Sequence, residues 1–550
     1  MISTGLQRLL ARSPKLLRRL GRNAGSRQAT GFRPRVELLE TRWLPSLTVG
    51  PNVNVSKLQN NQSEASIAIN PTNVNNLVAF SNEFAVASGI RVYVSNNGGT
   101  TWTSRVITNG DGLGVRGCCD TQAAFDNFGN LFVTYLDFVG ANTAVKVLLS
   151  TDGGTSFSLL ATLTSDGDQP SIAAGAGSVW VTYSDSAGTI SAQGAAVTGL
   201  GAIGAFSAAQ VAPSSSGGNF GNIAIGPSGQ VLITYQNPSG GQGPSTIYVN
   251  LDADGLGPGG FGGRVTASGT NVGGFDFIPA QKNRSVDAEA NLVYDRSGGA
   301  HNGRVYLVYT DESPNESNNT DILVRFSDNN GTTWSAPVRA NDDTTTRSQF
   351  MPAIAVDQGT GNVALSWYDA RNSGQNNTAQ IFATVSTDGG QTFQANVRVS
   401  GGPVSSNTDC NRADRANNCG DYYTMEFVGG VFYPVWADNS NSTNDNPNGK
   451  RAALDIYTAK VTVTGPAAGA ALPGGSPPGG GAGGSGASRS GGHLRRGQLD
   501  SIVFTIERLV NAPWEHGGRS NEESEHHSRA SAVDAVLASL ARVTEGDDLH

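Results

Sequence analysis

Short apolar runs separated by polar turns recur along the chain from residue 62 to about residue 464. Most runs are rich in Val, Ile, Tyr and Phe and are bounded by Gly, Asn and Asp, which is typical of β-strands. A first strand of each repeat begins at one of seven aligned positions, spaced 49 to 71 residues apart. These positions are Ser66, Gln122, Ser171, Asn222, Asn291, Ala353 and Thr424.

A second strand follows each first strand after a short turn, and it ends with an aromatic residue, any residue and then Asp or Asn. An Asp or Asn side chain at a strand end can accept hydrogen bonds from nearby backbone amides. We therefore interpret most of this set as caps. Its members are Asn82, Asp137, Asp185, Asn237, Asp311, Asp369 and Asp438.

A turn of the form Ser-x-Asp/Asn-x-Gly-x-Thr/Ser-aromatic joins a third strand to a fourth in four of the repeats. It occupies residues 95–102, 150–157, 327–334 and 386–393. The Asp or Asn side chain can hydrogen-bond the backbone of its own turn. The Gly supplies a positive φ, and burial of the aromatic ring is worth roughly 1.5–3 kcal/mol. The pattern predicts a tight β-hairpin, which has degenerated in repeats three and four.

Four strands repeated at this period predict the blades of a propeller. The expected fold is all-β, a seven-bladed β-propeller with four-stranded antiparallel blades. The seventh repeat lacks a fourth strand of its own, and residues 49–56 resemble the fourth strand at residues 393–400. We therefore predict that the N-terminal strand closes the last blade, because closure removes two exposed sheet edges.

Composition divides the chain around this propeller, which we place at residues 46–464. Residues 1–45 carry ten Lys/Arg against two Asp/Glu, and we expect a targeting, processing or disordered segment there. Residues 465–492 are rich in Gly and Pro, which predicts a flexible linker. Residues 493–550 are expected to be a mostly disordered tail with a short helix over 530–543. No apolar run approaches the length of a transmembrane helix.

Charge and residue usage narrow the function. The chain outside residues 1–45 holds 27 basic against 43 acidic residues, a balance that repels nucleic acid. His301 is the one histidine of the repeats, which argues against a three-histidine zinc site or a Ser-His-Asp triad there. The four cysteines are either inert thiols or bridges. The pairs to be considered are Cys410 with Cys419 and Cys118 with the adjacent Cys119.

Carboxylates occupy aligned positions just before the first strand of several repeats, where the loops meet at the mouth of a central channel. They are Glu64, Asp120, Glu289 and Asp421, while the third repeat offers Asp168-Gln169 and the sixth has Met351. Three chemistries fit such a ring, and the sequence leaves them open. The carboxylates could hold Ca²⁺, which takes six to eight oxygen ligands. They could also bind sugar hydroxyls, or act in pairs in glycoside hydrolysis.

Arginine residues fall in loops on the same predicted face, and arginines that converge bind carboxylates bidentately. They are Arg116, Arg284, Arg347, Arg371, Arg412 and Arg415. Arg412 and Arg415 are expected to neutralise neighbouring Asp residues. The candidate ligand-binding residues are Arg116, Arg347, Asp369, Arg371 and Tyr422, the last lying where the final blade enters the channel.

The repeated turn resembles the Asp box, or BNR repeat, of sialidase-like β-propellers over roughly residues 62–464. Gly420-Asp421-Tyr422-Tyr423 and Trp436-Ala437-Asp438 resemble the last blade of exported bacterial BNR-repeat proteins. The resemblance implies an extracellular or cell-surface location and a carbohydrate ligand. Sialidases also carry Phe/Tyr-Arg-Ile-Pro before the first box and have six blades. This chain has no such motif before Ser95, and seven repeats.

Three hypotheses follow. The first is an exported, monomeric propeller that binds a glycan or another cell-surface ligand through its carboxylate-rich face, without catalysis. The second is a glycoside hydrolase that uses two of Glu64, Asp120, Glu289 and Asp421 as acid and base. The third is a structural surface protein, which requires that backbone amides cap all of these carboxylates.

Overall fold

The computed structural model describes residues 46–464 except 84–88, 108–112, 114–116, 140–141, 239, 403–407 and 414–418. These residues belong to the first of two compact units, Met1–Leu472; the second, Pro473–His550, lies outside the described residues. The predictions for residues 1–45, 465–492 and 493–550 also fall outside them. The described part of the chain has no helix that is long and apolar enough to span a bilayer.

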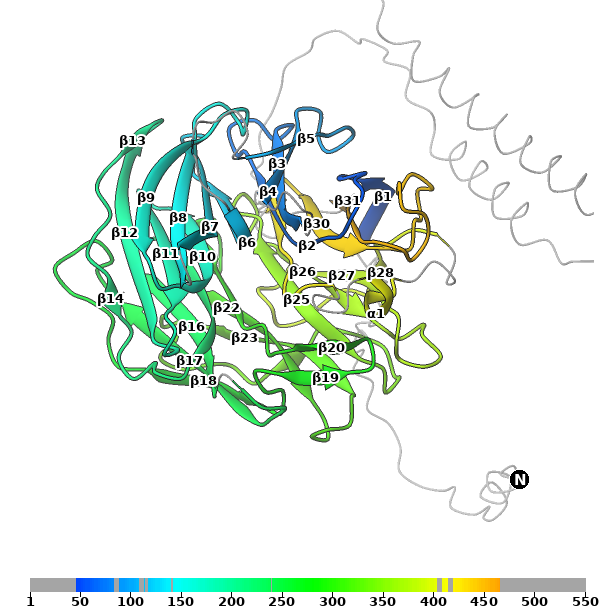
Figure 1. The fold of residues 1–550 in the computed structure, drawn as a ribbon. Helices are drawn as coiled ribbons and strands as arrows, with labels where there is room; N and C mark the ends of the chain where they lie inside the picture. Colours follow the sequence, from blue (N-terminus) through cyan, green and yellow to red (C-terminus); the bar gives the residue numbers. More distant parts are fainter. Residues whose placement is uncertain are drawn as a thin grey trace, which may run out of the picture. The chain divides into compact units, whose positions relative to one another are not determined.

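The seven-bladed propeller is confirmed, and its blades lie around a common centre (Figure 1). Blade 1 is β2 (Gln62–Ile69), β3 (Leu77–Glu83), β4 (Gly89–Ser95) and β5 (Thr103–Val106). Blade 2 is β6 (Gly117–Phe125), β7 (Leu131–Val139), β8 (Asn142–Ser150) and β9 (Ser158–Thr164). Blade 3 is β10 (Asp168–Gly175), β11 (Ser178–Ser184) and β12 (Ile190–Gly199), whose outer edge pairs with both β13 (Ala202–Ile203) and β14 (Gln210–Val211).

Blade 4 is β15 (Asn219–Ile225), β16 (Val231–Asn237), β17 (Ser245–Asp252) and β18 (Val265–Thr270). A hairpin of β19 (Asp276–Ile278) and β20 (Gln281–Val286) is inserted before blade 5, which is β21 (Asn291–Tyr294), β22 (Val305–Glu312), β23 (Thr320–Ser327) and β24 (Val338–Arg339). Blade 6 is β25 (Gln349–Val356), β26 (Val363–Asp369), β27 (Gln380–Ser386) and β28 (Val397–Arg398), and the short helix α1 (Cys410–Ala413) follows it.

Blade 7 confirms the predicted closure. It is formed by β29 (Met425–Val428), β30 (Val431–Asp438), β31 (Asp455–Thr464) and the N-terminal strand β1 (Ser46–Asn54). The antiparallel register of β1 and β31 runs from Ser46 opposite Thr464 to Asn54 opposite Tyr457. The first and last described strands therefore pair with each other, which closes the ring.

The repeated turns have the predicted hydrogen bonds in all four copies. In the last copy, Ser386 Oγ accepts a bond from Gly390 N at 2.8 Å and Asp388 Oδ1 accepts one from Thr392 N at 3.0 Å. The same pair of bonds recurs in the other three turns. These turns lie at the ends of the third strands. The carboxylate positions lie at the beginnings of the first strands, at the opposite end of each blade.

The glycine of each turn also packs against the neighbouring blade that comes before its own in the ring, and a substitution can test this packing. Gly154 has φ +89°, and a Cβ built there lies 2.9 Å from Val78 Cγ2. Gly154→Ala is expected to lower the free energy of unfolding by about 2 kcal/mol, through backbone strain and this clash. Gly263→Ala is the control, since no atom lies within 4 Å of its Cβ position. Denaturant unfolding that gives equal free energies for the two variants would contradict the packing role.

Candidate functional site

In five blades, one residue near the beginning of the first strand has a left-handed backbone conformation, with a positive φ. The residues and their φ values are Glu64 (53°), Asp120 (56°), Gln169 (47°), Glu289 (48°) and Met351 (51°). A β-bulge shifts the strand register at four of these positions. For residues with a Cβ this conformation costs on the order of 1–3 kcal/mol and is concentrated at functional sites. Three of the predicted carboxylates, Glu64, Asp120 and Glu289, share this left-handed conformation, and a bulge accompanies it at the first two.

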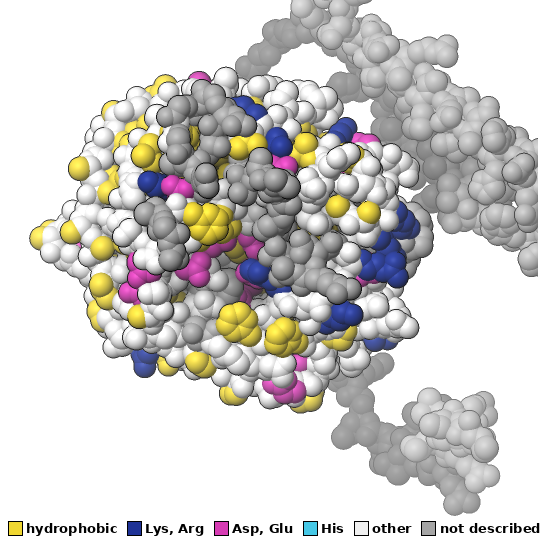
Figure 2. Space-filling model, in the orientation of Figure 1, with side chains coloured by type: hydrophobic (Ala, Val, Ile, Leu, Met, Phe, Trp, Pro, Cys, Tyr) yellow, Lys and Arg dark blue, Asp and Glu magenta, His cyan; other side chains and the backbone are white. Residues whose placement is uncertain are grey.

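Arg284 supplies the positive charge at this mouth, and it comes from the inserted hairpin. Its Nε and Nη2 both donate to the carboxylate of Asp421, and Nη2 lies 3.5 Å from Glu64 Oε1. The hairpin is held against the loop after α1, because Gln281 accepts a bond from Cys419 N at 3.0 Å and donates to Gly420 O at 2.9 Å. Figure 2 shows this face, with acidic side chains gathered near its centre beside basic ones.

The acidic mouth, as we name the cluster around Arg284, contains Glu64, Asp120, Asp168, Asp287, Glu289 and Asp421. Burial raises the pKa of Glu64 to about 7; the negative charge of Asp421 adds to this and Arg284 opposes it. Burial also raises the pKa values of Asp120 and Glu289 well above their ordinary range, and neighbouring carboxylates raise them further. The positive charge of Arg284 therefore faces several carboxyl groups, and these groups raise one another's pKa because two neighbouring negative charges repel.

Two polar atoms deep in the acidic mouth have no hydrogen-bond partner among the residues that the structure describes. They are Glu289 Oε1 and the Tyr422 hydroxyl, on side chains that are 4% and 8% exposed. Both residues line a cavity of about 30 Å³ together with Gln122, Gln169 and Asn222. A space of this size holds a single small group, such as a water molecule or one ligand hydroxyl. Arg284 and Asp421, whose side chains are 31% and 19% exposed, are solvent-accessible members of the acidic mouth, and we call this pair its rim.

The structure brings Glu64, Asp120, Glu289, Asp421 and Tyr422 together as the sequence predicts. Asp287 was not predicted. The sequence clue to its role is its position two residues before Glu289. In the structure its Oδ1 accepts a hydrogen bond from Glu289 N at 2.6 Å, which supports the left-handed turn. Asp168 accepts from Gln169 N at 3.1 Å, and the same amide lies 3.2 Å from Asp120 Oδ2.

The other candidate arginines that the structure describes have partners elsewhere. Arg371 forms ion pairs with Asp342 at 2.7 Å and Asp369 at 2.8 Å, and its guanidinium lies over the Phe382 ring. Arg347 Nη2 donates to Gly374 O at 2.8 Å. Arg116 and Arg415 lie outside the described residues, and Arg412 pairs with Asp409 at 3.3 Å, as a neutralising residue should.

Asp369 is a cap. It is 1% exposed, and it accepts bonds from Trp367 Nε1 at 2.8 Å and from Arg371 N at 2.8 Å. Asp438 repeats this arrangement with Trp436 Nε1 at 3.0 Å and Ser440 N. The capping interpretation of the second-strand endings is therefore confirmed at these positions. The local bonds of Asp369 and Arg371 explain why both lie outside the acidic mouth.

Both cysteine pairs form disulfides, Cys118–Cys119 and Cys410–Cys419. The first directly precedes Asp120, and the second closes the loop that ends just before Asp421. The bridges therefore constrain the backbone on two sides of the acidic mouth. In the described part of the chain, no group of three or more His, Cys, Asp or Glu side chains is arranged to hold a metal ion.

Comparisons with known proteins find distant structural similarity to solved propellers. No protein-family model matches the chain, and no curated protein matches it in sequence. Among solved structures, a Dyadobacter fermentans protein of unknown function is 12% identical, with a TM-score of 0.43 over 76% of this chain and 100% of its own. An α-L-arabinanase of Penicillium chrysogenum in complex with arabinobiose is 16% identical, with a TM-score of 0.38 over 61% of this chain and 97% of its own.

A Burkholderia pseudomallei lectin is also similar, at 10% identity and a TM-score of 0.40 over 61% of this chain and 84% of its own. Sialidases and arabinofuranosidases are among the matching structures as well. The chain is thus a propeller with distant structural similarity to glycosidases and a lectin. At these identities the likeness describes the fold alone.

Proposed function

We propose that the protein is an exported propeller that binds a glycan at the acidic mouth without hydrolysing it. The observation that carries this proposal is the pair of buried, unpartnered oxygens, Glu289 Oε1 and Tyr422 Oη, beside the accessible rim of Arg284 and Asp421. A sugar hydroxyl both donates and accepts. It can therefore donate to Glu289 while accepting from Tyr422 or Arg284.

Exposed aromatic rings beside the acidic mouth support the choice of a sugar. The hairpin that carries Arg284 also exposes Phe275 and Phe277, at 55% and 47%. Large exposed rings on a rigid element mark an interaction surface, and the apolar face of a pyranose can cover them. The two disulfides support export, since such bridges persist in oxidising compartments.

Glycan binding is tested with the full chain on a glycan array, followed by calorimetry of the best ligand. Glu289→Gln is expected to weaken binding at least tenfold, because it replaces an acceptor oxygen with a donor amide or turns the acceptor away. Phe277→Ala should weaken binding several-fold. Phe128→Ala is the matched control, since Phe128 is 46% exposed in the turn between β6 and β7, at the end of blade 2 away from the acidic mouth. An array without a bound glycan, or a Glu289→Gln protein that binds like the wild type, would overturn the proposal.

Glycoside hydrolysis is the second candidate, and one observation favours it. Glu64, with a pKa of about 7, lies beside Asp421, which is paired with Arg284. A proton-holding carboxyl next to a charged carboxylate is the arrangement that glycosidases use as acid and nucleophile or base. Turnover of a fluorogenic glycoside that Glu64→Gln and Asp421→Asn both abolish would establish hydrolysis in place of simple binding.

A further inference from the structure

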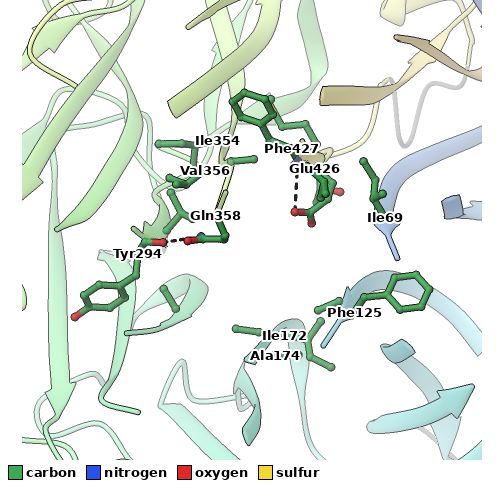
Figure 3. Close-up of a pocket in the computed structure, with 18 of the residues that line it drawn as sticks. Ile69, Phe125, Ile172, Ala174, Tyr294, Ile354, Val356, Gln358, Glu426 and Phe427 are labelled. Carbon is green, nitrogen blue, oxygen red and sulfur yellow. Dashed lines mark hydrogen bonds between the residues drawn. The ribbon is translucent and has the colours of Figure 1, made fainter. Parts of the chain in front are cut away.

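A second cavity occupies the central channel below the acidic mouth. Its volume is about 370 Å³, and its wall combines apolar side chains of the inner strands, such as Ile67, Ile172 and Val356, with polar and charged groups. Ligand pockets in proteins usually measure roughly 300–1,000 Å³. Figure 3 shows this cavity, with Ile69, Ile172, Ile354 and Val356 around its open centre.

A belt of polar side chains separates this cavity from the acidic mouth. Asn222 Nδ2 donates to Ser171 Oγ at 3.1 Å and to Asn291 Oδ1 at 3.0 Å, and Ser171 Oγ donates to Gln122 Oε1 at 3.2 Å. These bonds join the neighbouring blades 2 to 5 along part of the channel wall. Gln122, Asn222 and Asn291 line both the small upper cavity and the larger lower one. The lower cavity is therefore a separate site on the opposite side of the belt.

Two charged side chains, Arg296 and Glu426, line the lower cavity without pairing with each other. Among the residues that the structure describes, neither forms an ion pair within 4.0 Å. Within the described ranges, the only hydrogen bonds of the Arg296 guanidinium are long ones of 3.4 Å, from Nη1 and Nη2 to Ala174 O. Glu426 Oε1 accepts one bond, from Phe427 N at 3.4 Å (Figure 3).

Gly175 makes room for the guanidinium. A Cβ built on Gly175 would lie 2.0 Å from Arg296 Nη1. Arg296 is further fixed through its backbone, where Arg296 N donates to Gln358 Oε1 at 2.7 Å, and Gln358 Nε2 in turn donates to Tyr294 O at 2.9 Å. Residues at the ends of three inner strands therefore fix the position of Arg296. Most N–H donors of its guanidinium have no short hydrogen bond among the described residues.

We propose that the lower cavity binds a small amphipathic carboxylic acid, with its carboxylate on Arg296 and its hydrocarbon chain against the apolar inner strands. A guanidinium presents paired donors that match a carboxylate bidentately. An uncompensated charge inside an apolar channel is costly, and a bound carboxylate removes that cost. An amine of the same size would instead face Arg296 with a like charge.

Glu426 is compatible with an anionic ligand because burial raises its pKa to about 7, so below that pH it is largely neutral. The other charged groups lining the cavity are Arg296 and Asp357. Asp357 accepts bonds from Gly430 N at 2.8 Å and Gly429 N at 3.2 Å. A neutral Glu426 can donate a hydrogen bond to the bound carboxylate, whereas an ionised one repels it. Binding should therefore weaken as the pH rises from 6 to 8.

Calorimetry of the full chain with octanoate, octylamine and octanol tests this site. Octanoate should bind with a stoichiometry of one, and more tightly than octylamine or octanol. Arg296→Met should weaken octanoate binding at least tenfold, and Glu426→Gln should remove the weakening between pH 6 and pH 8. Ile172→Trp, which fills the cavity and keeps both charges, should abolish binding even if Arg296→Met proves poorly folded.

The acidic mouth provides the control, since Glu289→Gln should leave octanoate affinity unchanged. Three results would each overturn the proposal: no saturable octanoate binding, octylamine binding as tight as that of octanoate, or an Ile172→Trp protein that folds and still binds octanoate. None of these depends on whether a glycan binds above the belt, so this site and the glycan site can fail separately.

Discussion

Arg284→Met is expected to destabilise the propeller by about 2–3 kcal/mol at pH 8 and by much less at pH 5. Arg284 pairs with Asp421 and contacts Glu64, and breaking a buried ion pair costs roughly 3–5 kcal/mol. We place the effect below that range because the Arg284 side chain is 31% exposed. At pH 5 the carboxyl groups with raised pKa values, such as Glu64, Asp120 and Glu289, hold their protons, so the loss of Arg284 leaves fewer uncompensated charges than at pH 8.

Denaturant unfolding at both pH values measures this difference. Arg347→Met is the matched control, because Arg347 lies on the same face and, in the part of the chain that the structure describes, its guanidinium donates to Gly374 O and not to a carboxylate. The control should lose little stability at either pH. Equal losses for Arg284→Met at pH 5 and pH 8 would mean that Arg284 acts through packing alone, and that the carboxylates do not depend on its charge.

The wild-type protein is expected to be more stable at pH 5 than at pH 8, and Glu64→Gln should remove part of that difference. Glu64 has an ordinary pKa of 4.5, and burial raises it to about 7 in the folded state. The folded protein thus holds this proton more tightly than the unfolded chain does. The stability from Glu64 is fully present below pH 4.5 and is lost as the pH rises through about 7. At 1.36 kcal/mol per pH unit, it amounts to on the order of 3 kcal/mol.

Asp328→Asn controls for general effects of charge removal. Its ion pair with Arg304 lowers the pKa of Asp328, so this group stays ionised between pH 5 and pH 8. The substitution should therefore leave the pH dependence of the free energy of unfolding unchanged in that interval. A Glu64→Gln protein with the wild-type pH dependence would show that other groups of the acidic mouth, such as Asp120 and Glu289, carry the whole effect.

The blades could be predicted from sequence because each has local signals that repeat. The turn from Ser386 to Phe393 and the capping Asp369 are fixed by bonds within a few residues, so their pattern survives in the sequence. The closing strand was predictable for a related reason: the seventh repeat lacks a fourth strand, and residues 49–56 resemble one.

The composition of the acidic mouth was only partly predictable. The carboxylates at Glu64, Asp120 and Glu289 share an alignment position, but their left-handed backbone conformation has no residue signature, because Gln169 and Met351 adopt it as well. Arg284 lies on an insertion between blades 4 and 5, signalled only by the long spacing from Asn222 to Asn291. Which arginine reached the carboxylates depended on long-range packing of that hairpin on Gly420, whereas Arg371 was held by its own neighbour Asp369.

The pairing of β1 with β31 also decides how the protein can be mounted. Ser46 and Thr464 are neighbours in the register, and both lie at the end of blade 7 away from the acidic mouth. A tag or support attached through either flanking segment therefore starts from the reverse side of the propeller, away from the acidic mouth. Force that pulls Ser46 and Thr464 apart would break the β1–β31 hydrogen bonds one pair after another, starting from this end, before it strained any other blade.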